Sequence, residues 1–288
     1  MKEYLLFMDV SGDVARNYVD EGKVKLLPME FIINNQAHLY TAADDGIDVK
    51  QFYSMVKSRA DIKTTQITPA IYEDFFEPYL KDGYSVLYLC LSSGLSSTFQ
   101  SACAASATLK EKYPDVEMLP VDTLRATGCM GLLCEKMIAN KEKGMSLRDN
   151  YYDLEVYKYK LDACCYVDDL GALQRGGRIS KGTAVIGSLL DIKPLITFTK
   201  DGKLSNWGKQ RGIKLSIKKL VDFYLDKIDP AEKNCVYICH ADEDANASEL
   251  AAKITSVSPD CEVKTVLLSP IIGAHLGPGA LVLCFVTK

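Results

Sequence analysis

The sequence predicts an α/β protein of two α/β domains, the first with a largely parallel sheet and the second with a mixed sheet that contains a hairpin. Short apolar runs alternate with helical patterns through the first half of the chain, which is typical of βαβ units. In the second half, two strand-like runs flank Lys200–Lys203, whose Asp-Gly pair is a strong hairpin signal. With 288 residues, 48% of them hydrophobic, the chain is long enough for two cores. We therefore expect an N-terminal domain over residues 1–160 and a C-terminal domain over 161–288.

The first domain is expected to open with a buried strand, Tyr4–Val10, and the polar turn Ser11–Asp13. Asp9 and Asp13 suit turn-making and helix capping, because Asx side chains bond nearby backbone N–H groups. Thr68 is expected to cap a later helix. Further strands are expected at Lys25–Ile33, Ala37–Tyr40, Ser85–Leu91 and Val116–Val121. Helices are expected over Val14–Glu21, from Asp48 towards Arg59, from Pro69, from Thr98, from Asp122 towards Lys143, and over Leu147–Lys160.

In the second domain two segments interrupt the alternation of strands and helices. Leu173–Ile179 holds Gly176 and Gly177 between two arginines and predicts a tight turn. Ser269–Ala280, with three glycines, two prolines and one histidine, predicts a loop between two strands. Strands are expected at Leu161–Val167, Ile192–Thr199, Leu204–Lys209, Asn234–His240, Glu262–Leu268 and Leu281–Val286. Helices are expected over Arg211–Lys227 and around Ser248–Val257.

Composition and charge argue against several classes of protein. The net charge is −4, and lysines and arginines do not cluster with aromatics, so we expect no nucleic-acid partner. The N-terminal apolar run lacks the features of a signal peptide, and no run is long enough to span a membrane, so a cytoplasmic protein is expected. The ten cysteines form no C-x-x-C pair and there are only three histidines, which favours reduced core thiols over a metal site.

The segment Ser85–Ala107 predicts a ligand site, because it reads as a strand, a hydroxyl-rich loop and a helix. In a parallel sheet such a loop lies at the carboxyl end of its strand, where ligands bind and helix N–H groups attract an anion. The loop carries Ser93 and Ser96. Thr64 and Thr65, in another hydroxyl-rich loop, are not needed for capping and can bind a ligand.

His275 is the single titratable ring of the glycine-rich segment Ser269–Ala280, and we expect it to point into a site. Hydroxyls with an imidazole suit a carboxylate, which accepts several hydrogen bonds. The P-loop and the dinucleotide fingerprint are absent, so nucleotide binding is not expected. The nucleophile elbow G-x-S-x-G lacks its second glycine, which leaves a Ser-His acyl hydrolase or transferase, with Ser93 or Ser96, as an alternative.

Six segments, taken in order, resemble motifs of the DegV family of bacterial fatty-acid-binding proteins. Lys63–Thr68 is similar to the family's K-T-S-Q-P-S with Thr65 for Ser, and Gly273–Ala280 is similar to G-T-H-x-G-P-G-A with Ala274 for Thr. The other four segments are Asp9–Asp13, Ser92–Ala102, Arg175–Ile179 and Ile192–Pro194. The resemblance covers nearly the whole chain, and it implies two α/β domains with a long-chain fatty acid held between them.

The resemblance also implies roles for individual residues. Thr64 or Thr65, together with Ser93, would hydrogen-bond the carboxyl group, and Ser96 and His275 would support them. Residues near the site or on a partner surface would be Asp9, Ser11, Arg178, Lys193 and Gly273. No catalytic residue, metal or cofactor is implied besides the bound acid.

The partners implied are a fatty acid such as palmitate, stearate or oleate, and the catalytic protein of a fatty acid kinase, to which the carboxyl would be presented for acyl-phosphate formation. A transient contact with a membrane surface is also expected. The protein would then be a lipid carrier rather than an enzyme. A binder of sugars or other polar metabolites is a third hypothesis.

Overall fold

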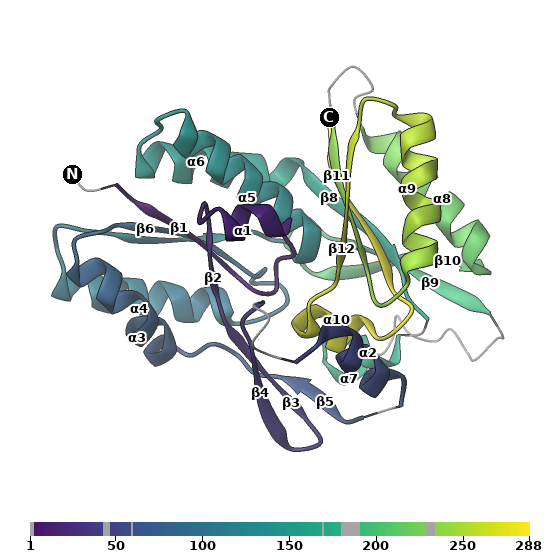
Figure 1. Ribbon diagram of the computed structural model, residues 1–288, viewed down its shortest axis with the longest axis horizontal. Coiled ribbons are helices and arrows are strands. Elements are labelled where there is room, and N and C mark those ends of the chain that lie inside the picture. The colour runs from purple at the N-terminus through teal and green to yellow at the C-terminus, as the bar shows by residue number, and fades with distance from the viewer. Residues whose placement is uncertain (1–2, 43–46, 59, 169, 180–190, 229–233) are drawn as a thin grey trace.

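The computed structural model describes residues 3–42, 47–58, 60–168, 170–179, 191–228 and 234–288. Within these residues the strands form three sheets: a four-stranded sheet, a six-stranded sheet and a small three-stranded sheet. Figure 1 shows the four-stranded sheet and the six-stranded sheet side by side, with the small sheet below them. This arrangement confirms the predicted α/β class with one parallel and one mixed sheet.

The four-stranded sheet is parallel throughout and has the order β2-β1-β6-β7. Its strands are β1 (Leu5–Asp9), β2 (Lys25–Leu27), β6 (Val86–Cys90) and β7 (Met118–Asp122). Helices α3 (Pro69–Lys81) and α4 (Thr98–Lys112) lie on one side of the sheet, and α5 (Thr127–Glu142) and α6 (Leu147–Tyr157) lie on the other (Figure 1). Because both faces are covered, β6 is buried along its whole length, as its unbroken apolar run predicts.

The expected strand Lys25–Ile33 is divided at Pro28 into two strands of different sheets. The first part is β2, and the second is β3 (Met29–Ile33), which pairs antiparallel with β4 (Gln36–Tyr40) and β5 (Ile62–Thr64). Proline lacks the N–H that a continuous ladder needs, which explains the break. The turn after β3 has Asn34 and Asn35 in left-handed conformation, with φ of 49° and 67°, as a tight hairpin requires.

Helices α1, α2 and α3 begin within two residues of the predicted positions, and two of them are capped by the expected side chains. Helix α1 covers Arg16–Asp20. Helix α2 covers Val49–Lys57, and the Asp48 carboxylate accepts a hydrogen bond from the Lys50 N–H; the expected end at Arg59 lies outside the described residues. The Thr68 hydroxyl likewise caps α3 by accepting from the Ile71 N–H.

The six-stranded sheet is mixed and has the order β10-β9-β8-β13-β11-β12. Its strands are β8 (Leu161–Tyr166), β9 (Ile192–Phe198), β10 (Leu204–Arg211), β11 (Cys235–His240), β12 (Glu262–Leu267) and β13 (Leu281–Val286). Only β11 and β12 pair in parallel, and β9 and β10 form the predicted hairpin. The last strand, β13, therefore lies in the middle of the sheet. Helices α8 (Ile213–Lys227) and α9 (Asp244–Val257) cover one face (Figure 1).

Helix α5 joins the two large sheets, because it packs on β1 of one sheet and on β8, β11 and β13 of the other. Two of its glycines permit this approach: a Cβ on Gly128 would lie 2.5 Å from the Cβ of Tyr237, and one on Gly131 would lie 2.4 Å from the Asp13 carbonyl oxygen. One continuous core includes the four-stranded sheet and the α5-facing side of the six-stranded sheet, and a second core lies under α8 and α9. The domain boundary at residue 160 stays a prediction.

Two expected irregular segments are partly helical. Pro270–Leu276, expected in a loop, forms α10, and only the residues after it form the loop that leads to β13. The expected tight turn after β8 begins as the short helix α7 (Gly171–Arg175), and Gly177 then turns the chain with φ of 71°. The glycines and prolines of these segments led to the prediction of irregular structure. A proline at the first helical position and a glycine at the end also suit a short helix.

The ten cysteines are all free. They include Cys90, Cys164 and Cys284 in strands and Cys129 and Cys134 in α5, where they are buried as small apolar side chains. None of the helices described here has the length and apolar character that crossing a membrane requires.

Candidate functional site

A cavity of about 410 Å³ lies where the carboxyl ends of β5, β6 and β7 meet the six-stranded sheet. Its volume lies within the usual range for small-molecule sites. The apolar lining residues are Met29, Leu91, Leu95, Ala126, Cys165, Leu173, Phe198, Leu204, Ile271, Ile272, Leu276 and Val282. The polar lining residues are Thr64, Thr65, Gln66, Ser93, Ser96, Ser97, Thr127, Arg178 and His275. The cavity is thus an apolar space with a limited set of polar groups.

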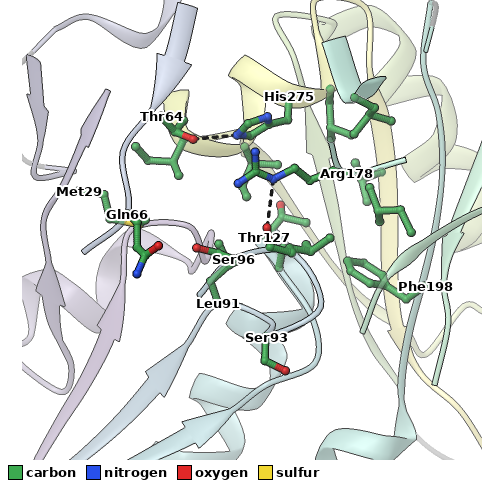
Figure 2. A pocket seen from close by; sticks show the side chains of 18 of the residues that line it. Met29, Thr64, Gln66, Leu91, Ser93, Ser96, Thr127, Arg178, Phe198 and His275 are labelled. Carbon is green, nitrogen blue, oxygen red and sulfur yellow. Dashed lines mark hydrogen bonds between the residues drawn. The ribbon is translucent and has the colours of Figure 1, made fainter. Parts of the chain in front are cut away.

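Thr64 and His275 meet at one end of the cavity (Figure 2). The Oγ1 atom of Thr64, at the end of β5, lies 2.9 Å from Nε2 of His275 on α10. Gly176 lies against the other ring nitrogen, and a Cβ there would be 2.7 Å from Nδ1. Burial, and secondly the nearby Arg178 guanidinium, lower the pKa of His275 to about 4. The imidazole is therefore neutral at pH 7, with one nitrogen held by Thr64.

Arg178 is a half-buried cation without a carboxylate partner among the residues that the structure describes. Its Nε donates to the Leu95 carbonyl oxygen at 3.0 Å, and Nη1 donates to the Gly176 carbonyl oxygen. Burial lowers the pKa of Arg178, which nevertheless remains charged at neutral pH. A partly desolvated cation in an apolar wall is stabilised by an anion, so this end of the cavity favours a negatively charged group.

Ser96 and Ser93 both line the cavity from the loop between β6 and α4, but at different places. The Ser96 hydroxyl lies 2.7 Å from that of Thr98. The Ser93 N–H donates to the Asp122 carboxylate at 3.0 Å, while its hydroxyl has no hydrogen-bond partner within the described ranges. Figure 2 shows Ser93 at the far end of the view from Thr64 and His275, with Ser96 between. The structure therefore brings Ser96, and not Ser93, towards the Thr64–His275 pair.

Three other expected site residues make contacts of their own. The Thr65 hydroxyl donates to the Glu30 carbonyl oxygen at 3.2 Å, although the residue lines the cavity. The ammonium group of Lys193 lies 2.8 Å from the Asp168 carboxylate, in an ion pair outside the cavity lining. Gly273 on α10 allows close packing, since a Cβ would lie 2.3 Å from the Tyr53 hydroxyl.

Asp9 and Ser11 lie behind the cavity wall. Both are fully buried, and the Asp9 carboxylate accepts hydrogen bonds from the Ser11 hydroxyl, the Tyr88 hydroxyl and the Leu91 N–H. Burial raises the pKa of Asp9. Since Leu91 begins the loop that carries Ser93 and Ser96, Asp9 fixes the start of that loop and does not itself face the cavity.

Several lining residues that sequence reasoning missed come from the six-stranded sheet. Cys165, Phe198, Leu204 and Val282 supply one wall of the cavity. Apolar side chains occur on both faces of such strands, so the sequence pattern does not distinguish one that faces the cavity from one that faces α8 or α9. Thr127 was missed because it is the first residue of α5, where a threonine is expected to serve the helix start and not a ligand.

This set of groups suits a ligand with an anionic head and an apolar body. The neutral His275, the hydroxyls of Thr64 and Ser96, and the Arg178 cation offer donors at one end, while aliphatic and aromatic side chains line the rest. No group of three metal-ligating side chains occurs in the part of the chain that the structure describes.

Comparison with known proteins gives the family of the chain. The model of the DegV family of uncharacterised proteins matches residues 5–288. A DegV domain-containing protein of Clostridium perfringens is 34% identical over 285 residues, which cover 99% of this chain and 98% of the relative. The crystal structure of DegV from Bacillus subtilis, a fatty acid binding protein, has a TM-score of 0.86 at 26% identity and covers 100% of both chains. The Fatty Acid Kinase B3 protein of Streptococcus pneumoniae, loaded with linoleic acid, shares the fold with a TM-score of 0.85 at 20% identity and full coverage of both chains. The chain therefore belongs to the DegV family.

Proposed function

We propose that this protein binds a long-chain fatty acid, with the carboxylate at the Thr64–His275 end of the cavity and the acyl chain along its apolar walls. The observation that carries the proposal is Arg178, a half-buried cation that lacks a carboxylate partner among the described residues and lines an otherwise apolar cavity. A fatty acid supplies both the missing anion and the apolar body. The fatty acid binding protein from Bacillus subtilis, at 26% identity, supports the same ligand class.

The head group is proposed to accept hydrogen bonds from Thr64 and from the neutral imidazole of His275, with the Ser96 hydroxyl and the Arg178 guanidinium beside it. Thr65 and Ser93, the other hydroxyls expected to bind the carboxyl, stay predictions. Ser93→Ala tests whether the carboxylate lies beside Ser93 or at the Thr64 end of the cavity. A loss of about 1 to 3 kcal/mol in binding free energy would place the carboxylate at Ser93, and an unchanged affinity would place it at the Thr64 end.

The acyl chain supplies most of the affinity in this proposal. Burial of about 15 methylenes at ~0.8 kcal/mol each sets an upper bound near 12 kcal/mol, before the costs of ordering the ligand and the protein. The polar groups then orient the acid and discriminate against apolar molecules without a carboxylate.

The protein is further proposed to present the carboxylate to the catalytic protein of a fatty acid kinase, and to work in the cytoplasm with transient membrane contact for loading. Arg178 supports presentation, because it lines the cavity at the head-group end and is only half buried. The expected readout is acyl phosphate formed from bound oleate when a bacterial fatty acid kinase and ATP are added. Free oleate phosphorylated equally well without this protein would contradict presentation.

The first test of the proposal is mass spectrometry of the lipid extracted from protein purified from a bacterial host. A carrier should yield fatty acids in amounts comparable to the protein, and Arg178→Met should yield less. Protein that is empty and also fails to take up added palmitate or oleate would rule the proposal out. A polar ligand instead of lipid would favour the metabolite binder.

A Ser-His hydrolase is less well supported by the geometry. In the described ranges the ring nitrogen Nε2 of His275 is paired with Thr64, and neither Ser93 nor Ser96 hydrogen-bonds the imidazole. A serine nucleophile needs a base within hydrogen-bond reach. Turnover of an activated ester that His275→Ala abolishes would restore this alternative, whereas retained lipid binding without turnover removes it.

A further inference from the structure

The tip of the β9–β10 hairpin packs on the parallel sheet close to the cavity. The Ser92 hydroxyl, just after β6, donates to the Gly202 carbonyl oxygen at 2.8 Å. Gly94 lies directly against the same turn, since a Cβ on it would be 2.6 Å from the Gly202 carbonyl carbon. Gly202 adopts φ of 77°, a conformation that favours glycine. The backbone of the hairpin tip therefore packs directly on the backbone of the loop that follows β6.

Phe198 and Leu204 lie between this contact and the cavity. They flank the hairpin turn as direct cross-strand neighbours, and both line the cavity. In Figure 2 the Phe198 ring lies well away from the Thr64–His275 pair, with the cavity between them. A chain that starts at the head-group end therefore runs towards Phe198.

The Phe198 ring is held in place by a buried arginine. The Arg125 guanidinium lies over the ring, 5.4 Å from its centroid, and the residue is only 6% exposed. Arg125 is itself fixed, because Nε donates to the Leu161 carbonyl oxygen and Nη1 to the Leu124 carbonyl oxygen, each at 2.8 Å. A cation over an aromatic face is attractive, and here the cation cannot move aside. The ring is thus a rigid wall and not an adaptable one.

We propose that Phe198, held by Arg125, sets the longest acyl chain that this protein accepts. This inference rests on the proposed function and deepens it, because it assigns chain-length selection to one ring on the six-stranded sheet. Acids whose terminal methyl group reaches the ring bind best. Each further methylene has no space beyond Phe198 and lowers the affinity.

The test compares Phe198→Ala with the unaltered protein in competition binding of a series of saturated fatty acids of increasing length. Removal of the ring opens space beyond the normal end, and each additional methylene buried there should raise the affinity about fourfold. The optimum should therefore move to longer acids. Phe198→Trp, which fills the same space further, should move it to shorter ones and provides a second readout.

Phe223→Ala is the matched control. Phe223 is also a partly buried phenylalanine beside a cation, with Lys227 4.1 Å from its ring centroid, but it packs on Trp207 outside the cavity lining. This variant loses as much side chain as Phe198→Ala and should keep the length preference of the unaltered protein.

The outcomes separate the two proposals. A shift of the optimum in Phe198→Ala or in Phe198→Trp, absent in Phe223→Ala, supports the assignment. A uniform change at every length, or the same shift in Phe223→Ala, overturns it while leaving fatty acid binding intact. An unaltered protein that retains none of the acids overturns the proposed function and the assignment with it.

Discussion

Thr64 Oγ1 lies 2.9 Å from His275 Nε2, although the two residues are 211 positions apart in the sequence. The bond joins the small antiparallel sheet to helix α10 at one end of the cavity. It also fixes the ring orientation, because Gly176 lies against the opposite nitrogen. A neutral imidazole with one nitrogen committed to a threonine can orient a carboxylate but is poorly placed to activate a serine.

Loss of the Arg178 charge should weaken fatty acid binding more than any loss of a neighbouring charge. A hydrogen bond to a charged group contributes about 1.5 to 3 kcal/mol, so Arg178→Met is expected to reduce the affinity for oleate roughly 10- to 100-fold. Arg175→Met is the control, because Arg175 is exposed and does not line the cavity. Equal losses in the two variants, measured by titration calorimetry, would argue against a direct contact.

Protonation of His275 should destabilise the fold as the pH falls. Its pKa in the folded protein is about 4, mainly because of burial, whereas the unfolded chain binds this proton at about pH 6.5. The free energy of unfolding should thus decrease by up to about 3 kcal/mol between about pH 6.5 and about pH 4. Urea denaturation across this window measures the slope, and His275→Gln should flatten it. A slope that survives the substitution would assign the effect to other groups.

Asp13 should act in the opposite direction. Its carboxylate accepts hydrogen bonds from the Thr127 hydroxyl and, at 3.0 Å, from the Ser269 N–H, but burial raises its pKa to about 7. The folded protein therefore keeps a proton that the unfolded chain has released above about pH 4, and the stability from this group is lost as the pH rises towards 7. The stability of Asp13→Asn relative to the unaltered protein should rise by up to about 4 kcal/mol over that window. Parallel denaturation curves would contradict this.

Gly202→Ala should lower the free energy of unfolding by more than the cost of backbone strain, because it disturbs the contact between the hairpin tip and Ser92. Gly202 has φ of 77°, and a Cβ would lie 2.2 Å from the Ser92 hydroxyl oxygen. Gly22 has φ of 69° and nothing within 4 Å of the place that a Cβ would take. Gly22→Ala therefore measures the cost of backbone strain alone. We expect about 1 kcal/mol for Gly22→Ala and at least about 2 kcal/mol more for Gly202→Ala, measured by urea unfolding. Similar losses of unfolding free energy in the two variants would mean that the contact between the hairpin tip and Ser92 adapts without cost.

Much of the fold is predictable from the sequence, because strand and helix patterns are local. The capping side chains of Asp48 and Thr68 and the Asp-Gly hairpin depend on a few adjacent residues, and all three lie where expected. Pro28 and α10 were misjudged for a different reason. Whether a proline interrupts one strand or separates two sheets, and whether Pro270–Leu276 coils, depends on what packs against the segment.

The site is predictable only in part. Hydroxyls and a histidine stand out against an apolar sequence, which is why Thr64, Ser96 and His275 could be named as candidates, and all three line the cavity. Their grouping depends on contacts between distant segments, so the sequence does not separate Ser93 from Ser96. The apolar wall has no signal in the sequence, because Phe198 resembles any other apolar strand residue until its neighbours are known.

The central place of β13 has a consequence for how the protein is made. Leu281–Val286 lies between β8 and β11 and is synthesised after both of them. Until it leaves the ribosome, β8 and β11 lack their shared neighbour, and the cavity lacks Val282. Such a late, non-local pairing is slow to form. A nascent chain therefore has no complete cavity, and a chain cut short before β13 should be a substrate for proteolysis instead of a protein that merely binds more weakly.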